Sequence, residues 1–163
     1  MGSILARLTD ILRLRSGPQD MPAGWIPAIL ASLAYLAQGF WADRIFNESD
    51  TSPRSLLAIT VQFLIIAALL NIKQLKSRLP QTLTTLAGAG LIFGFLSLFL
   101  VHQADPEAIQ PLLTLMWLAL FLWSLAVDAH IYRQALSITM SLGMLLAVLI
   151  FAATFILIQT VFG

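Results

Sequence analysis

Residues 81–101 read QTLTTLAGAGLIFGFLSLFLV, a stretch in which no side chain carries a charge. At about 1.5 Å per helical residue, roughly 20 such residues cross the hydrocarbon core of a bilayer. Four further uncharged runs of similar length occur, at residues 24–42, 55–72, 108–127 and 137–162. The sequence therefore predicts an all-α integral membrane protein, a bundle of five transmembrane helices joined by short connections.

The composition agrees with a membrane protein and excludes several kinds of site. Hydrophobic residues make up 59% of the 163 residues and charged residues only 10%, whereas soluble domains carry about 25% charged residues. The absence of cysteine excludes disulfides, iron–sulfur clusters and cysteine zinc sites, and two histidines are too few for a histidine-rich metal site. No catalytic motif is present. We expect no enzyme activity, no cofactor and no nucleic-acid partner.

Positive charge is distributed unevenly between the connections. If the N-terminus lies in the cytoplasm, seven Lys and Arg residues fall on the cytoplasmic side and two on the outer side. The seven are Arg7, Arg13, Arg15, Lys73, Lys76, Arg78 and Arg133, and the two are Arg44 and Arg54. The positive-inside rule then predicts a cytoplasmic N-terminus and, after five spans, a C-terminus on the opposite side.

Residues 1–17 form a segment distinct from the membrane domain at 18–163. Apolar residues lie on one stripe at helical spacing, namely Ile4, Leu5, Leu8, Ile11 and Leu12. We predict a short amphipathic helix in the cytoplasmic headgroup layer, with this stripe towards the lipid. Contacts with anionic lipid headgroups are expected from Arg7, Arg13, Arg15, Lys73, Lys76 and Arg78. The alternative is a hydrophilic leader that only supplies positive charge.

Small residues are concentrated in the third predicted span. Gly90 and Gly94 form a GxxxG pattern, and Gly88 and Ser97 extend the run of small side chains. Small residues four apart flatten one face of a helix and let a second backbone approach closely. This surface predicts either docking of a membrane partner or a second copy, or contact with another helix of the same chain.

Asp128 is the one acidic residue that adjoins an apolar run on the predicted cytoplasmic side. A carboxylate deep in a membrane costs about 2.5–3.5 kcal/mol on insertion scales, so such residues are candidates for function. Three interpretations are open. Asp128 forms an ion pair with Arg133 or with the basic residues at 73–78, it contacts lipid headgroups or a partner, or it takes part in proton coupling.

Uncharged polar residues also occur in or at the ends of the spans. They include Tyr35, Gln38, Thr60, Gln62, Asn71, Thr154 and Gln159. Interhelical hydrogen bonds, worth about 0.6 kcal/mol each, account for them. A transport pathway usually adds broken helices or several charges at the midplane, and neither is visible in the sequence.

The layout resembles that of a known family. Residues 79–94, LPQTLTTLAGAGLIFG, precede a tryptophan-containing span and residues 122–137, LWSLAVDAHIYRQALS, which lead into the last span. Over residues 55–162 the chain resembles bacterial members of the Yip1-like family of small five-helix membrane proteins. The resemblance implies a bacterial inner membrane protein with an interaction or organising role and no catalytic residues.

Two functions of different classes follow from these features. The first is a non-enzymatic accessory or scaffold protein, which packs against other membrane proteins or a second copy through the span at 81–101 and against anionic lipids through its basic face. The alternative is a small oligomeric transporter or channel in which Asp128 is the coupling acid.

Overall fold

The chain is all-α in a computed structural model that describes residues 4–46, 53–105 and 109–163. The helices are α1 (Ile4–Leu12), α2 (Trp25–Phe46), α3 (Arg54–Ile72), α4 (Leu79–His102), α5 (Pro111–Leu136) and α6 (Met140–Phe162), with 3-10 turns η1 (Pro18–Asp20) and η2 (Lys76–Arg78). Of these helices, α2 to α6 are long and apolar enough to cross a membrane, which confirms the predicted fold class. Residues 1–3 and residue 108, the predicted start of the fourth span, lie outside the described residues.

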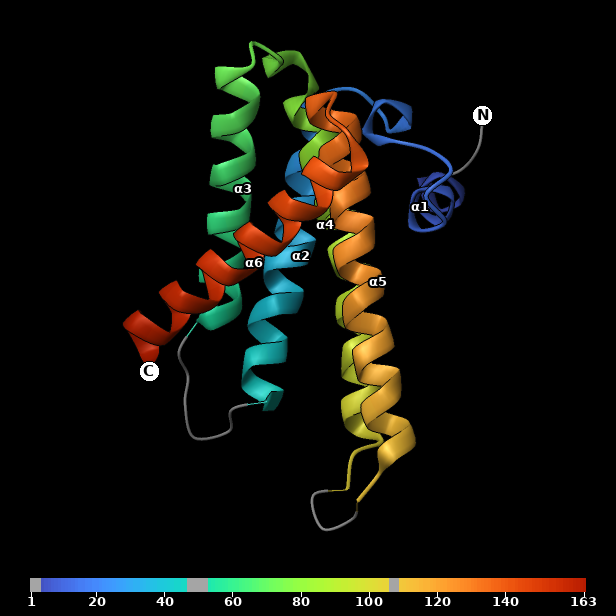
Figure 1. Ribbon diagram of the computed structural model, residues 1–163, viewed down its shortest axis with the longest axis vertical. Helices are drawn as coiled ribbons and strands as arrows, with labels where there is room; N and C mark the ends of the chain where they lie inside the picture. The colour runs from blue at the N-terminus through green and yellow to red at the C-terminus, as the bar shows by residue number, and fades with distance from the viewer. Residues whose placement is uncertain (1–3, 47–52, 106–108) are drawn as a thin grey trace.

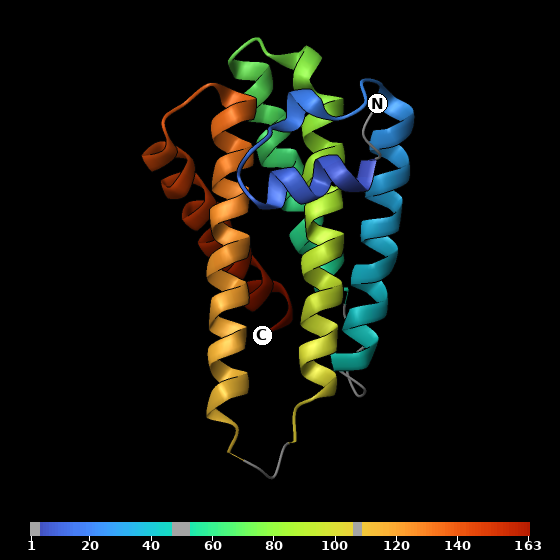
Figure 2. The same ribbon diagram turned by 90° about the vertical axis from the view of Figure 1, so that its right-hand side faces the viewer.

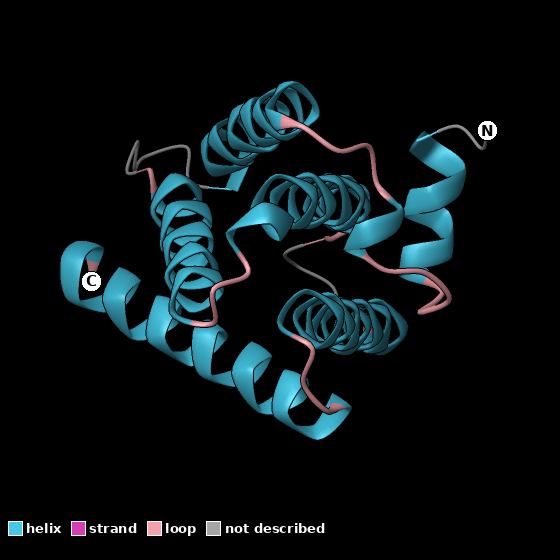
Figure 3. Cartoon of the chain, turned by 90° about the horizontal axis from the view of Figure 1, so that it is seen from above, coloured by secondary structure: helices cyan, strands magenta, loops and turns pink. Residues whose placement is uncertain are grey.

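Helices α2 to α5 run side by side along the long axis of the molecule, and α6 crosses them obliquely (Figure 1). Seen from above, α4 lies between α2 and α5, while α6 packs on α5 and α3 (Figure 3). We call the end with the α3–α4 and α5–α6 connections the basic end, because Lys73, Lys76, Arg78 and Arg133 lie there. The opposite end, at which α2 ends and α3 begins, is called the far end.

The fourth span is longer than the sequence predicted. It was expected to end at residue 127, but α5 continues to Leu136. Its last turns are buried against the rest of the protein, with Ile131 fully buried and Tyr132 nearly so. The polar residues in these turns therefore face other helices or the basic end. For this reason Asp128, the first charged residue of the segment, does not mark the end of the helix.

The amphipathic helix α1 exists, but three of the five residues of its apolar stripe pack against protein. Leu8, Ile11 and Leu12 are buried in the common core, whereas Leu5 remains 72% exposed. Figure 2 shows α1 lying across α4 and α5, near the basic end. A Cβ at Gly88 of α4 would meet the Leu8 side chain, so this glycine makes room for α1.

Hydrogen bonds to its backbone hold the N-terminal segment in this position. The Trp123 indole Nε1 donates to the Leu12 carbonyl oxygen at 3.1 Å. His130 Nε2 lies 2.9 Å from the Ser16 carbonyl oxygen, which only accepts, so this nitrogen is the donor. Gln81 Nε2 donates to the Met21 carbonyl at 2.9 Å. Side chains of α4 and α5 thus satisfy carbonyl groups that the N-terminal segment leaves free.

Candidate functional site

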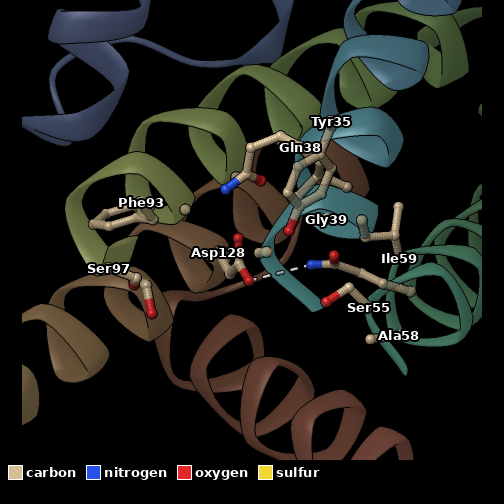
Figure 4. A pocket seen from close by; sticks show the side chains of 15 residues that line it. Tyr35, Gln38, Gly39, Ser55, Ala58, Ile59, Phe93, Ser97 and Asp128 are labelled. Atoms are coloured by element: carbon tan, nitrogen blue, oxygen red, sulfur yellow. Dashed lines mark hydrogen bonds between the residues drawn. The ribbon is translucent and has the colours of Figure 1, made fainter. Parts of the chain in front are cut away.

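A polar chamber lies inside the bundle, between α2, α3, α4 and α5. It is a cavity of about 310 Å³ that adjoins a second cavity of about 250 Å³ reaching α6. Both are lined by Tyr35, Ala58, Ile59, Gln62, Ser124 and Asp128. The lining of the first extends to Ser55, the second residue of α3, at the far end. Polar groups from four helices therefore meet in one space (Figure 4).

Glycines on α4 make room for the polar side chains of α2. A Cβ at Gly90 would meet the Tyr35 ring, and a Cβ at Gly94 would meet the Gln38 side-chain amide. The GxxxG surface is therefore occupied by α2 of the same chain, which was one of the two interpretations of the sequence. Ser97, one turn further along α4, lines the chamber.

Asp128 projects into the chamber from α5. Its Oδ2 accepts a hydrogen bond from Gln62 Nε2 at 3.2 Å, and the same amide nitrogen donates to the Tyr132 hydroxyl at 2.8 Å. The side chain is half-buried, because part of the carboxyl group faces the cavity. Gln62 thus links the acid on α5 to α3 and leaves the remaining carboxylate surface available to a ligand.

The predicted ion pair between Asp128 and Arg133 is not formed among the described residues. Residues five apart on a helix project about 140° away from each other, and Arg133 is exposed at the basic end while Asp128 faces the interior. The basic residues at 73–78 do not line the chamber either. Among the residues that the structure describes, no Lys, Arg or His lines either cavity, so the lining groups that Asp128 faces are uncharged.

A second buried acid, Asp43, has a structural role at the far end. Its two carboxylate oxygens accept hydrogen bonds from Ser55, one from the backbone N–H at 2.9 Å and one from the hydroxyl at 2.6 Å. A carboxylate at this position caps the first turn of α3 and interacts favourably with the positive end of its dipole. Asp43 therefore fixes the start of α3, and with it Ser55 at the edge of the chamber.

Some of the predicted headgroup residues bind the protein itself. Arg78 Nη1 donates to the Ala135 carbonyl at 3.1 Å and to the Ser137 hydroxyl at 2.7 Å, and Lys73 Nζ donates to the Leu136 carbonyl at 3.2 Å. These cations satisfy the free carbonyl groups at the C-terminal end of α5.

The other predicted headgroup residues divide in the same way. Arg7 donates to the Asp20 carbonyl oxygen, which ties α1 to η1. Arg13, Arg15 and Lys76 are exposed. These three side chains are positioned to contact lipid headgroups. That contact stays a prediction.

The chamber was not predicted, although its residues show a signal in the sequence. Ser124, Asp128 and Tyr132 are spaced by four on α5, and Tyr35 and Gln38 are spaced by three on α2. Each pair or triplet therefore shares one helical face. From the sequence, Tyr35 and Gln38 were assigned to interhelical hydrogen bonds and Asp128 was interpreted separately, because periodicity within one helix does not show which helical faces oppose each other.

Comparison with protein-family models, with curated proteins and with solved structures finds no match to this chain. The resemblance to the Yip1-like family therefore stays a prediction, and the chemistry of the chamber is the basis for a functional assignment.

Proposed function

We propose that the chain is a small membrane transport protein that binds a positively charged solute in the chamber, with Asp128 as the acid that engages it. One observation carries this proposal. The Asp128 carboxyl group faces a cavity of about 310 Å³ whose lining has no cationic side chain. An acid inside a membrane protein normally pairs with a cation or marks an ion pathway. A positively charged solute supplies the cationic partner that the described residues lining the chamber do not provide.

The rest of the lining suits a small ligand. Tyr35, Gln38, Ser97 and Ser124 offer hydroxyl and amide groups among apolar walls that include Ile59 and Phe93. Ligand sites usually combine apolar walls with a few convergent polar groups, in cavities of about 300–1,000 Å³. The chamber is at the lower end of this range, which favours a small cation over a large solute.

The two ends of the chamber differ in a way that fits a transport protein. Towards the far end its lining reaches Ser55 at the start of α3. Towards the basic end lies a layer of fully buried residues that includes Ile66, Leu70 and Ile131. This arrangement corresponds to a state with access from the far end, and transport requires a second state in which the buried layer separates.

The accessory role predicted from the sequence now has less support. It depended on the face of Gly90 and Gly94, which Tyr35 and Gln38 of the same chain cover. A partner that docks on the bundle would have to use a different, lipid-facing surface. We therefore rank transport of a cation above a scaffold role.

Uptake by purified protein in liposomes tests the proposal. We expect wild-type protein to take up radiolabelled methylammonium, and Asp128→Asn to reduce uptake at least about tenfold, because the cation loses its only charged partner. Asp10→Asn makes the same acid-to-amide change on the exposed side of α1 and serves as the control. Equal uptake by the two variants, or no uptake of methylammonium, sodium or potassium by the wild type, would contradict the proposal.

We also propose that the protein resides in a bacterial inner membrane with the basic end in the cytoplasm. Support comes from the seven Lys and Arg residues assigned to that side against two on the other. The chain has no cysteine, so single cysteines are clean reporters. In intact cells a membrane-impermeant maleimide should label Gln103→Cys at the far end and should reach Lys76→Cys only after lysis. The reverse pattern would overturn this orientation.

A further inference from the structure

A third cavity adjoins the chamber and is lined in part by exposed residues on the outside of the bundle. It has a volume of about 450 Å³ and lies between α4 and α5. It is lined by Phe93, Ser97, Thr114, Trp117, Leu118, Leu120, Phe121 and Ser124. Phe93, Ser97 and Ser124 also line the chamber, so the two spaces adjoin at these residues. We call this third cavity the α4–α5 groove.

The groove and the chamber differ in polarity. Apart from the shared Ser97 and Ser124, Thr114 is the only hydroxyl residue in the lining of the groove. Leu118 in its wall is 52% exposed, on the surface that faces lipid in a membrane. A path from the bilayer to Asp128 therefore runs from apolar to polar surroundings, which is the polarity profile of an amphiphile with its headgroup inside.

Helix α1 does not block this path. It crosses α4 and α5 beside Gly88 and Trp123. Ser97 lies nine residues beyond Gly88 on α4, about 13 Å nearer the far end, and Trp117 lies six residues, or about 9 Å, from Trp123 in the same direction. The groove thus opens on the part of the α4–α5 interface that α1 leaves uncovered.

Building on the proposed function, we infer that the cation is an amphiphilic amine, with its ammonium group at Asp128 and its hydrocarbon chain in the α4–α5 groove. It reaches the chamber sideways from the bilayer. An ordinary phospholipid headgroup does not fit this site, because none of the three cavities has a Lys, Arg or His to bind a phosphate. Charge and polarity thus select an amine without a phosphate.

Binding of two amines to the full chain in phosphatidylcholine nanodiscs tests this inference. Radiolabelled dodecylamine has the chain and the ammonium group, whereas propylamine has the ammonium group alone. Leu118→Trp fills the groove, and Leu122→Trp makes the same change one turn away, at a residue that is similarly exposed (55%) but does not line the groove. Partitioning of dodecylamine into the disc is common to all variants, so ratios between variants report the protein site.

We expect Leu118→Trp to weaken dodecylamine binding about tenfold or more, since several methylene groups of the chain lose their apolar contacts. The same variant should bind propylamine as the wild type does, which also shows that it is folded. Leu122→Trp should bind both amines normally, and Asp128→Asn should weaken both.

The outcomes separate this inference from the proposal on which it rests. If Leu118→Trp and Leu122→Trp bind dodecylamine equally well while Asp128→Asn weakens both amines, the cation site stands and the lateral route is wrong. If the wild type binds neither amine, or Asp128→Asn binds both normally, the cation site itself is wrong and the inference falls with it.

Discussion

The half of the bundle near the basic end and the half near the far end are built from the same five spans but are packed differently. In the basic half, α1 joins the spans and residues such as Ile66, Leu70 and Ile131 are fully buried. The chamber begins at the level of Asp128 and extends from there towards the far end, where α6 crosses obliquely, and no Lys, Arg or His of the described residues lines it. The difference indicates that packing near the basic end contributes more to stability, and on the proposed function the space that remains towards the far end holds the ligand.

The largest difference between the halves is expected from glycine substitutions. A Cβ at Gly143 of α6 would meet the backbone carbonyl oxygen of Ala129, whereas a Cβ at Gly94 would meet only the end of the Gln38 side chain. Because a backbone cannot move aside as a side chain can, Gly143→Ala should lower the free energy of unfolding by about 3 kcal/mol and Gly94→Ala by about 1 kcal/mol. Unfolding in mixed micelles measures both, and equal losses would contradict the contrast.

The next test makes one enlargement in each half. Ala135 is 2% exposed in the basic half, and Ala58 lines both parts of the chamber. Ala135→Leu should cost about 2 kcal/mol through overpacking. Ala58→Leu has cavity to grow into, so its stability should stay within about 0.5 kcal/mol of the wild type, while methylammonium binding is lost. A stability loss at Ala58 as large as at Ala135 would mean that the chamber is not an open space.

The third test compares the stability effects of removing the two acids, Asp43 and Asp128, and the expected difference is smaller. Asp43→Ala removes the cap of α3 and should cost about 1 kcal/mol. Asp128→Ala removes one hydrogen bond of 3.2 Å together with the burial of an acid, and these opposing effects should leave stability within about 0.5 kcal/mol of the wild type. Thermal unfolding of the two variants side by side measures the difference. A clear loss for Asp128→Ala would indicate a structural acid.

The smallest expected effect is a gain. Gln74, in the turn after α3 at the basic end, has a φ of 59°, a conformation that disfavours residues with a Cβ. Gln74→Gly should therefore stabilise the protein by about 0.5 kcal/mol. Gln103 follows α4 at the far end with a φ of −87°, so Gln103→Gly should destabilise it slightly. The measurement is the unfolding temperature, which should rise slightly for Gln74→Gly and fall slightly for Gln103→Gly.

The sequence predicted the spans well because the thickness of the bilayer dictates their length. The ends were less predictable, as α5 shows by continuing past Asp128 to Leu136, where protein and not lipid surrounds it. The prediction that the apolar stripe of α1 faces lipid was wrong for Leu8, Ile11 and Leu12, which are buried against protein. An amphipathic stripe shows that a helix buries one face, but it does not distinguish lipid from protein as the partner.

The site was the least predictable part, since it depends on how helices face one another. Asp128 was singled out from the sequence as a candidate, but its predicted partner Arg133 projects to a different side of α5. Gln62, which binds the acid, lies 66 residues away along the chain. Only tertiary packing joins them. Polar residues spaced by three or four on several spans are nevertheless a usable sign of a shared polar space.

The attachment of α1 has a consequence for biosynthesis. The Leu12 carbonyl and the Trp123 indole that binds it are 111 residues apart. At roughly 5–20 residues per second, a ribosome needs about 6–20 s to make that interval. Until α5 is made, the docking site of α1 consists of α4 without α5, and the headgroup layer can accommodate the apolar stripe of the nascent helix. The interfacial helix predicted from the sequence thus describes an intermediate of the nascent chain. This intermediate ends when α5 is inserted and α1 docks on it.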